Sequence, residues 1–269
     1  MKQAIKKVVP FNLGVKLRGA YQKVLRIAYS GQKYYCPFCE NTFRKLLTGG
    51  EDHPVVAEKN IVGAGRRPNM VCPRCYSTDR DRLVYLYLKS SGFFNHPAKV
   101  LHIAPEGSLK HLLETKENLD YTTGDKFEEG YTDYYYDRDV LQMDVTKIPF
   151  ANDSFDLLIC NHVLEHIEDD RLAMNEIHRV LKPGGQAILQ VPVSRSLEKT
   201  EETKLDNPQD REKHYGQHDH VRVYAEDYKD RLSEEGFTVE VRNAVKENWV
   251  PDLEKYAVNP EENIYIAKK

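Results

Sequence analysis

The sequence predicts an α/β fold with a parallel sheet in its carboxyl-terminal two thirds, preceded by a small metal-stabilised unit. Residues 155–160 (FDLLIC) and 187–191 (AILQV) are nearly continuous apolar runs, as expected of strands covered on both faces. Between them apolar residues recur at helical spacing until KPGG at 182–185 ends the helix. A strand, a helix and a strand in this order form a crossover between parallel strands. Two CxxC pairs near the amino terminus indicate the metal-stabilised unit.

The charge of the chain is divided between two segments. Residues 1–95 contain 17 lysines and arginines against 6 aspartates and glutamates, whereas residues 96–269 contain 22 against 36. A basic segment beside an acidic one suggests either an anionic partner for the first or an attraction between the two.

No apolar run approaches the roughly 18 residues needed to cross a bilayer. The amino terminus is basic with a short apolar centre, but Pro10 and Asn12 interrupt it and no small-residue cleavage site follows, so we do not expect a signal peptide. The sequence thus favours a cytoplasmic protein without a transmembrane segment.

Residues 1–35 are predicted to form a basic helical segment. They contain eight basic residues and no acidic one, and apolar side chains recur at roughly helical spacing from Val15 to Ala28. Such a stripe either packs on its own protein or contacts an anionic membrane surface or another partner.

Residues 36–95 are predicted to form a zinc ribbon and a linking helix. The two CxxC knuckles are separated by 32 residues and would supply four thiolates to one tetrahedral site, formed by Cys36, Cys39, Cys72 and Cys75. Disulfides are the alternative, but a cytosolic chain keeps its thiols reduced. Four cysteine ligands leave no position for a catalytic water, so we expect structural Zn²⁺.

The segment between the knuckles is rich in glycine, which favours an extended ribbon with a mobile tip. His53 lies in this segment and needs no role there. Beyond the second knuckle stand Arg74, Arg80 and Arg82, whose guanidinium groups could bind phosphate or carboxylate, or pair with neighbouring aspartates. Residues 81–90 (DRLVYLYLKS) then read as the linking helix.

The block around 142–192 carries a strand ending in Asp144, then PF and SFD, and an LKPGG turn before the next strand. These motifs resemble the class I S-adenosylmethionine-dependent methyltransferases, specifically the type 11-like group, and the resemblance covers roughly residues 99–269. It implies a methyltransferase domain over 96–269 with a Rossmann-like seven-stranded sheet whose last strand is antiparallel. The remaining elements are expected as strands at 99–103, 121–125, 237–241 and 263–267 and helices at 106–117 and 224–236.

The resemblance also implies the cofactor, S-adenosyl-L-methionine, and the residues that bind it. In this family the turn after the first strand is rich in glycine, yet here Ala104, Glu106 and Ser108 stand at the usual glycine positions and His102 stands where an acidic residue is common. Glu106 would either meet the cofactor's positive groups or favour the helix amino terminus. The cofactor-binding set by resemblance is Ala104, Pro105, Glu106, Gly107, Asp125, Lys126, Asp144, Val145, Asn161 and His162.

Candidate bases lie on loops after the strands. Residues 194–220 are too polar and too long for a plain connection and end in a histidine-rich stretch, from which we select His218 and His220 as the catalytic base. The same stretch could clamp an anionic substrate with Arg222, bind a second metal, or merely anchor the loop. His162, Glu165 and His166 follow the fourth strand and are further candidate bases, although Glu165 and His166 are expected on a helix, where they are either bases or plain surface residues.

Three functions remain open from the sequence. The first is methylation of a small-molecule or glycan, carrier-linked acceptor, possibly anionic, most simply at oxygen. The second is methylation of a base in ribosomal RNA, which the acidic charge of residues 96–269 disfavours. The third is a non-catalytic zinc-ribbon interaction protein whose altered donor turn has lost cofactor binding. A tyrosine cluster at 131–136 fits a stacking or lid role in any of them.

Overall fold

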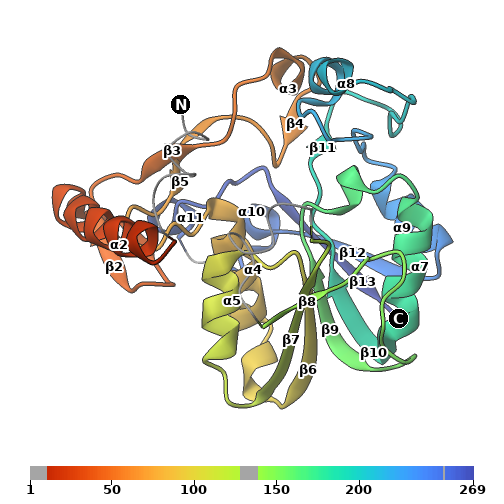
Figure 1. The fold of residues 1–269 in the computed structure, drawn as a ribbon, viewed down its shortest axis with the longest axis horizontal. Helices are drawn as coiled ribbons and strands as arrows, with labels where there is room; N and C mark the ends of the chain where they lie inside the picture. The colour runs from red at the N-terminus through yellow and green to blue at the C-terminus, as the bar shows by residue number, and fades with distance from the viewer. Residues whose placement is uncertain (1–10, 128–138, 251) are drawn as a thin grey trace.

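A seven-stranded sheet forms the centre of the computed structural model, which describes residues 11–127, 139–250 and 252–269 (Figure 1). Its strand order is β12-β13-β10-β9-β6-β7-β8, and β13 runs antiparallel to both of its neighbours while the other pairs are parallel. The predicted α/β class, with an antiparallel last strand, is confirmed. The strands are β6 (Ala98–Ile103), β7 (Leu119–Asp125), β8 (Val140–Gln142), β9 (Phe155–Cys160), β10 (Leu181–Ile188), β12 (Thr238–Asn243) and β13 (Asn263–Lys268).

Helices cover both faces of this sheet, so its central strands are buried on both sides (Figure 1). On β9, Leu157 and Ile159 face one apolar cluster and Leu158 and Cys160 face the other. The first cluster is covered by α4 (Asp79–Ser90), α5 (Gly107–Glu114) and α10 (Ala244–Glu247), and the second by α7 (Asp170–Val180) and α9 (Tyr228–Glu234). This two-sided burial explains why the FDLLIC run has no polar alternation.

Several boundaries differ from the sequence prediction. The helix expected between β9 and β10 is interrupted: a 3₁₀ turn, η2 (Leu164–His166), precedes α7, whose start is capped by the Asp169 carboxylate accepting from the Leu172 amide at 2.9 Å. The third strand ends at Gln142, two residues before Asp144. Asp144 therefore lies on the turn beyond the strand.

The amino-terminal part forms a compact unit above the sheet. It contains α2 (Phe11–Ala28), β1 (Ser30–Cys36), β2 (Asn41–Phe43), β3 (Leu47–Gly49), α3 (Pro54–Glu58), β4 (Ile61–Val62) and β5 (Arg67–Val71). The segment between the knuckles is not an extended ribbon with a free tip. It contains α3, which lies beside α8 (Pro208–Tyr215), and β4, which pairs with β11 (Val193–Ser194) from the carboxyl-terminal part (Figure 1).

Helix α2 makes few contacts with the rest of the chain. Among its described side chains Leu25 is buried, while Leu17, Tyr21, Val24 and Ile27 are exposed. The remaining short elements are η1 (Phe93–Asn95) and α11 (Leu253–Tyr256). None of the helices in the described ranges combines the length and the apolar character that a bilayer span requires.

Arg82 joins the amino-terminal unit to the carboxyl-terminal segment. Its side chain is completely buried and donates to the carbonyls of Ser77 (2.9 Å) and Met70 (3.0 Å) on one side and of Tyr256 (2.7 Å) and Ala257 (3.0 Å) on the other. Sequence reasoning expected an anion or an aspartate as its partner. In the structure these four hydrogen bonds all go to backbone carbonyl oxygens. Arg82 therefore links the two parts of the fold and does not bind an anion.

Glu262 lies near the same junction and makes stability depend on pH. Burial and the neighbouring carboxylates of Asp79 and Asp81 raise its pKa to about 7, against the opposing effect of Arg67 and Arg80. The folded protein therefore holds this proton more tightly than the unfolded chain, and this contribution to stability is lost as the pH rises through about 7.

Replacing Glu262 by Gln removes the ionisable carboxyl group and should therefore remove the loss of stability that accompanies its ionisation as the pH rises. We expect the Tm of Glu262→Gln to exceed that of the wild type by roughly 3–8 °C at pH 8 and by much less at pH 5, measured by thermal unfolding in buffers of equal ionic strength. The exposed neighbour variant Glu261→Gln should show no such pH-dependent difference. A Glu262→Gln protein that is less stable than the wild type at pH 8 would contradict this account.

Candidate active site

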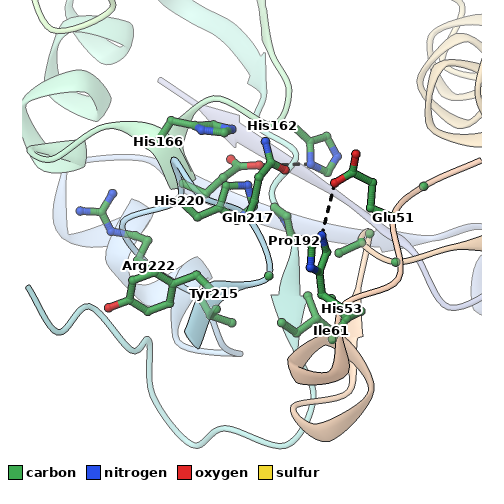
Figure 2. Close-up of a pocket in the computed structure, with 18 of the residues that line it drawn as sticks. Glu51, His53, Ile61, His162, His166, Pro192, Tyr215, Gln217, His220 and Arg222 are labelled. Carbon is green, nitrogen blue, oxygen red and sulfur yellow. Dashed lines mark hydrogen bonds and ion pairs between the residues drawn. The ribbon is translucent and has the colours of Figure 1, made fainter. Parts of the chain in front are cut away.

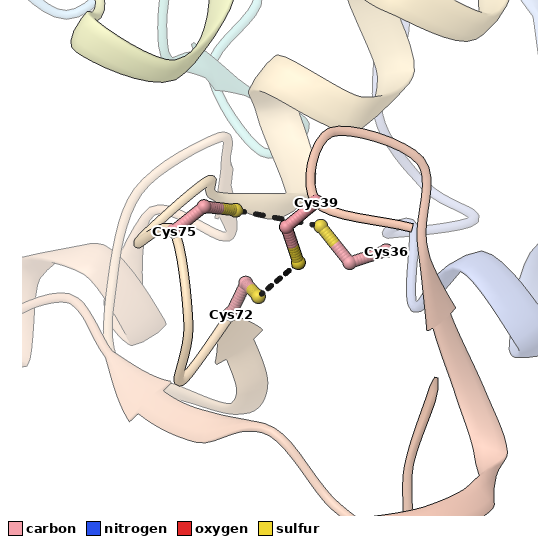
Figure 3. A group of neighbouring side chains, drawn as sticks. All are labelled: Cys36, Cys39, Cys72 and Cys75. Carbon is pink, nitrogen blue, oxygen red and sulfur yellow. Dashed lines mark hydrogen bonds between the residues drawn. The ribbon is translucent and has the colours of Figure 1, made fainter. Parts of the chain in front are cut away.

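Four cysteine sulfurs converge where the two knuckles meet (Figure 3). The Sγ atoms of Cys36 and Cys75 lie 3.5 Å apart and those of Cys39 and Cys72 lie 3.7 Å apart. A disulfide would need about 2.05 Å, whereas four sulfurs at about 2.3 Å from one tetrahedral ion lie about 3.8 Å apart. All four are free thiols, so the set fits a zinc ion.

The surroundings of this cluster also suit thiolates. The Ser77 hydroxyl lies 3.2 Å from Cys36 Sγ, and the Arg74 amide donates to Cys72 Sγ at 3.4 Å. Such donors stabilise negative charge on sulfur and orient the ligands. The four residues could therefore hold a metal with no position left open for a substrate.

The turn after β6, residues 104–108, is called the donor turn because the family resemblance places the methyl donor there. At Ala104 its backbone has the geometry that a glycine would normally supply. Ala104 has a φ of 48°, in the left-handed region, and its amide donates to the Gly124 carbonyl at 2.8 Å. An alanine in this conformation costs about 1–2 kcal/mol. The turn thus keeps its shape at Ala104 although the glycine is absent, and Pro105 continues it into α5.

Glu106 occupies the amino end of α5 and points back toward β6. Its carboxylate accepts from His102 Nε2 at 2.7 Å and from Asn161 Nδ2 at 3.0 Å. Burial alone would raise the pKa of Glu106, but these two hydrogen bonds outweigh it and hold the pKa below its usual value. On its other side, His102 lies 2.8 Å from the Tyr121 hydroxyl.

A cavity of about 930 Å³ opens beside this carboxylate. It is lined by the donor turn, by the end of β9, by the second cysteine knuckle with the start of α4, and by Arg18 and Gln22 of α2. Its size is within the range of small-molecule sites. The lining residues from the predicted cofactor set are Glu106, Gly107, Asn161 and His162. Ser108 ties the donor turn to the knuckle because its hydroxyl donates to the Cys75 carbonyl at 3.0 Å.

The other predicted cofactor residues lie along the same edge of the sheet but do not line this cavity. Asp125 ends β7 and accepts from the Lys126 amide at 2.8 Å. Lys126 Nζ lies 3.1 Å from Asp144, which also accepts from the Thr146 hydroxyl at 2.6 Å, and these contacts lower the pKa of Asp144. Val145 beside it is buried. The tyrosines at 131–136 lie outside the described residues.

A second cavity, of about 480 Å³, lies between the docked amino-terminal unit and residues 192–223 (Figure 2). Its lining is rich in titratable side chains, among them His162, Glu165, His166 and His220. His162 and Arg80 line this cavity as well as the first one, so the two cavities adjoin at these side chains.

His162 is held by Glu165 at this junction. Its Nδ1 lies 3.3 Å from Glu165 Oε1, and its backbone φ of 54° is in the left-handed region. Within the described part of the chain, neither His162 Nε2 nor Glu165 Oε2 has a hydrogen-bond partner, although both are buried. Buried polar atoms without partners are rare and indicate a place for a ligand.

The charges in this cluster are arranged around Glu165. Burial raises the pKa of Glu165, but the hydrogen bond from His162 and the rings of His166 and His220 lower it to about 2. Burial and Arg80 lower the pKa of His162, and burial likewise lowers that of His220. Against the effect of burial, the contacts with Asp219 and Glu165 raise the pKa of His166. The expected state is an anionic Glu165 beside neutral His162 and His220, with His166 the ring that binds a proton most readily.

The sequence-selected bases are placed differently from one another. His220 is buried in the second cavity, whereas His218 lies at its rim with a side chain that is two-thirds exposed. Arg222 is no substrate clamp, because it is buried and donates to the carbonyls of Leu164 and Glu168.

Two lining residues differ from what the sequence indicated. Glu165 was a candidate base that could equally lie on a helix surface, and the 3₁₀ turn η2 directs it inward, with a side chain that is only 2% exposed. His53 was given no role, yet it lines the cavity between Glu51 (3.3 Å) and Glu212 (3.5 Å). No sequence signal marks His53, because its position depends on how residues 50–65 dock.

Comparison with known proteins supports the methyltransferase resemblance. Residues 114–189 match a family model described as a methyltransferase domain. A demethylmenaquinone methyltransferase from Streptomyces avermitilis is 39% identical over 46 residues, covering 17% of this chain and 20% of that protein. One from Corynebacterium glutamicum is 33% identical over 90 residues, covering 33% of this chain and 39% of that protein. The chain thus spans between a fifth and two fifths of these relatives.

Among solved structures, a SAM dependent methyltransferase from Archaeoglobus fulgidus aligns with a TM-score of 0.47 at 14% identity, covering 72% of this chain and 96% of that one. The family match and the named relatives show that residues 114–189 and their surroundings are similar to methyltransferase domains.

The cysteine cluster predicts that metal removal destabilises the protein. We expect Cys39→Ala to lose one equivalent of zinc by elemental analysis and a strong chelator to lower the wild-type Tm by roughly 10 °C or more, because metal binding is coupled to folding. Cys160→Ala, in which the replaced thiol lies inside the sheet, is the control and should keep its zinc. Equal zinc content in Cys39→Ala and the wild type would rule the site out.

Proposed function

We propose that the protein transfers a methyl group from S-adenosylmethionine to an oxygen atom of a small polar acceptor. The observation that carries the proposal is that the two cavities adjoin at His162 and Arg80. A donor bound in the first cavity and an acceptor bound in the second would meet there, away from bulk water. Methyl transfer requires this kind of alignment and exclusion of water.

The donor would be held along the carboxyl edge of the sheet. In open α/β sheets, ligands bind outside the carboxyl ends of the strands, and a carboxylate ending the second strand can accept both ribose hydroxyls of an adenosyl group. Asp125 holds that position, and the Asp144 turn lies beside it through Lys126. Glu106 supplies a carboxylate for the donor's positively charged end and so offsets the absence of an acidic residue at His102.

When bound, S-adenosylmethionine supplies a methyl group on a sulfonium, which is already activated for transfer. His162 would act as general base. Because its Nδ1 is hydrogen-bonded to the Glu165 carboxylate, its Nε2 carries the lone pair and can accept the proton of an acceptor hydroxyl. Glu165 is a positioning residue in this assignment. His218 would then contact the acceptor from the rim of the second cavity, and His220 would form part of the wall behind it.

The lining of the second cavity favours a hydroxyl-bearing, possibly anionic, acceptor. Arg80 and several histidines supply hydrogen-bond donors, while Ile61, Pro192 and Val223 add an apolar wall. An RNA base is less favoured because the cavity lies under the docked unit, between α3 and α8. The names of the matched relatives suggest a quinone-type acceptor as a second candidate, with transfer to carbon.

The amino-terminal parts would have separate roles in this proposal. The zinc ribbon and linking helix at 36–95 would form one wall of the acceptor cavity. A methyltransferase domain at 96–269 would form the opposite wall. The segment at 1–35 includes α2, whose exposed apolar side chains are flanked by Arg18, Lys23 and Arg26. This combination suits contact with an anionic membrane surface or an acidic partner.

Donor binding can be tested without knowing the acceptor. We expect S-adenosylhomocysteine to bind the wild type in isothermal titration calorimetry and Asp125→Ala to weaken the Kd by roughly 10- to 100-fold, because hydrogen bonds to a charged group are lost. Asp120→Ala, an exposed position on the same strand, should leave the Kd unchanged. Absence of binding to the wild type at millimolar ligand would overturn the proposed function.

The acceptor class can be tested by label transfer. With methyl-labelled S-adenosylmethionine and a fractionated cell extract, we expect label in the low-molecular-weight fraction. His162→Gln should reduce this transfer about a hundredfold while keeping the Kd for S-adenosylhomocysteine within about twofold, since a base acts mainly on turnover. Label found in RNA, or undiminished transfer by His162→Gln, would contradict the assignment.

A further inference from the structure

Two histidines and a glutamate in the second cavity form a group distinct from the four cysteines. Glu165 and His166 come from η2 and His220 from the loop before α9, and their ligand atoms all lie within 4.8 Å of one another. All three side chains line the cavity, and Figure 2 shows two of them, His166 and His220. In the described ranges, this group and the four cysteines are the two that have the composition and the spacing for a metal ion.

Glu165 contributes an unsatisfied buried oxygen to this group. Glu165 has a side chain that is 2% exposed, and its Oε1 lies 3.3 Å from His162 Nδ1. Its other oxygen, Oε2, is buried with no hydrogen-bond partner among the described residues. Leaving a buried carboxylate oxygen unpaired is costly, and a bound cation would remove that cost.

A carboxylate outside the cluster orients one of the two histidines. His166 Nδ1 lies 3.3 Å from Asp219 Oδ2, which leaves Nε2 as the ligand atom. The rings of His166 and His220 meet edge to face with centroids 4.6 Å apart. A carboxylate behind a ligating imidazole is the usual outer contact of a metal-binding histidine, because it fixes the ring and its tautomer.

We propose that Glu165, His166 and His220 bind a divalent transition metal ion, foremost Zn²⁺, with an open coordination position facing the acceptor cavity. Two histidines and one carboxylate are a ligand set that zinc uses in catalytic sites, where the fourth position holds water or substrate. The cysteine cluster differs because it has four protein ligands and no open position.

The ion's role would be to bind the acceptor oxygen and lower the pKa of its hydroxyl. Glu165 would then contact the metal through Oε2 and orient His162 through Oε1, so that one carboxylate connects the two groups that act on the acceptor. This role rests on the proposed function. The metal site itself does not.

Metal content of the full-length protein tests the proposal directly. After metal removal and dialysis against Zn²⁺, we expect two zinc ions per wild-type chain, one in His220→Ala and one in Cys39→Ala. Asp219→Asn should retain the site but weaken its affinity roughly 10- to 100-fold, as expected for loss of an outer contact. His218→Ala, at the rim of the same cavity, should bind as much zinc as the wild type.

Cobalt substitution answers the question even if the His220 variant folds poorly. In the Cys39→Ala protein, Co²⁺ should give a visible absorption band without thiolate charge transfer. In the wild type the same band should accompany the thiolate charge transfer of the cysteine site, and Glu165→Gln should remove that band. A wild type whose cobalt spectrum shows thiolate ligation alone, or a His220→Ala protein with full zinc content, would overturn the proposal. Zinc retained without binding of S-adenosylhomocysteine would instead refute only the proposed function.

Discussion

The docking of the amino-terminal unit on the carboxyl edge of the sheet is the constraint on which both cavities depend. Arg82 makes it possible, because a buried guanidinium must satisfy its donors and here it satisfies them with carbonyls from both parts of the chain. The two-residue pairing of β4 with β11 adds a second attachment. Each cavity takes one wall from the unit and the other from the sheet's edge. Without this docking the site would be an open surface.

The donor side shows how an altered motif can keep its geometry. Ala104 adopts the left-handed conformation that glycine would adopt. His102 stands where the family commonly has an acidic residue, and Glu106 supplies a carboxylate that is hydrogen-bonded to it. His102 then becomes the partner of that carboxylate, and Asn161 supplies the second hydrogen bond. Two departures from the family pattern, His102 and Glu106, are thus partners of each other.

The fold could be predicted because its signals are local. The apolar run of β9, the KPGG stop and the Asp144 turn each depend on neighbouring residues, and they led to the observed sheet. The cysteine cluster was equally readable from its spacing. The acceptor cavity was not, because it depends on contacts between distant segments: His53 enters it through the position of α3, and Arg82 is indistinguishable in sequence from an anion-binding arginine. Glu165 was misplaced because a 3₁₀ turn replaces the expected α-helix.

The central claim is that donor and acceptor meet at His162, between the edge of the sheet and the docked unit. A crystal structure of the protein with S-adenosylhomocysteine tests this most directly. The account predicts the ribose against Asp125, the amino-acid end beside Glu106, and the sulfur directed toward His162 and the second cavity. A ligand bound elsewhere, or a sulfur directed away from His162, would contradict it.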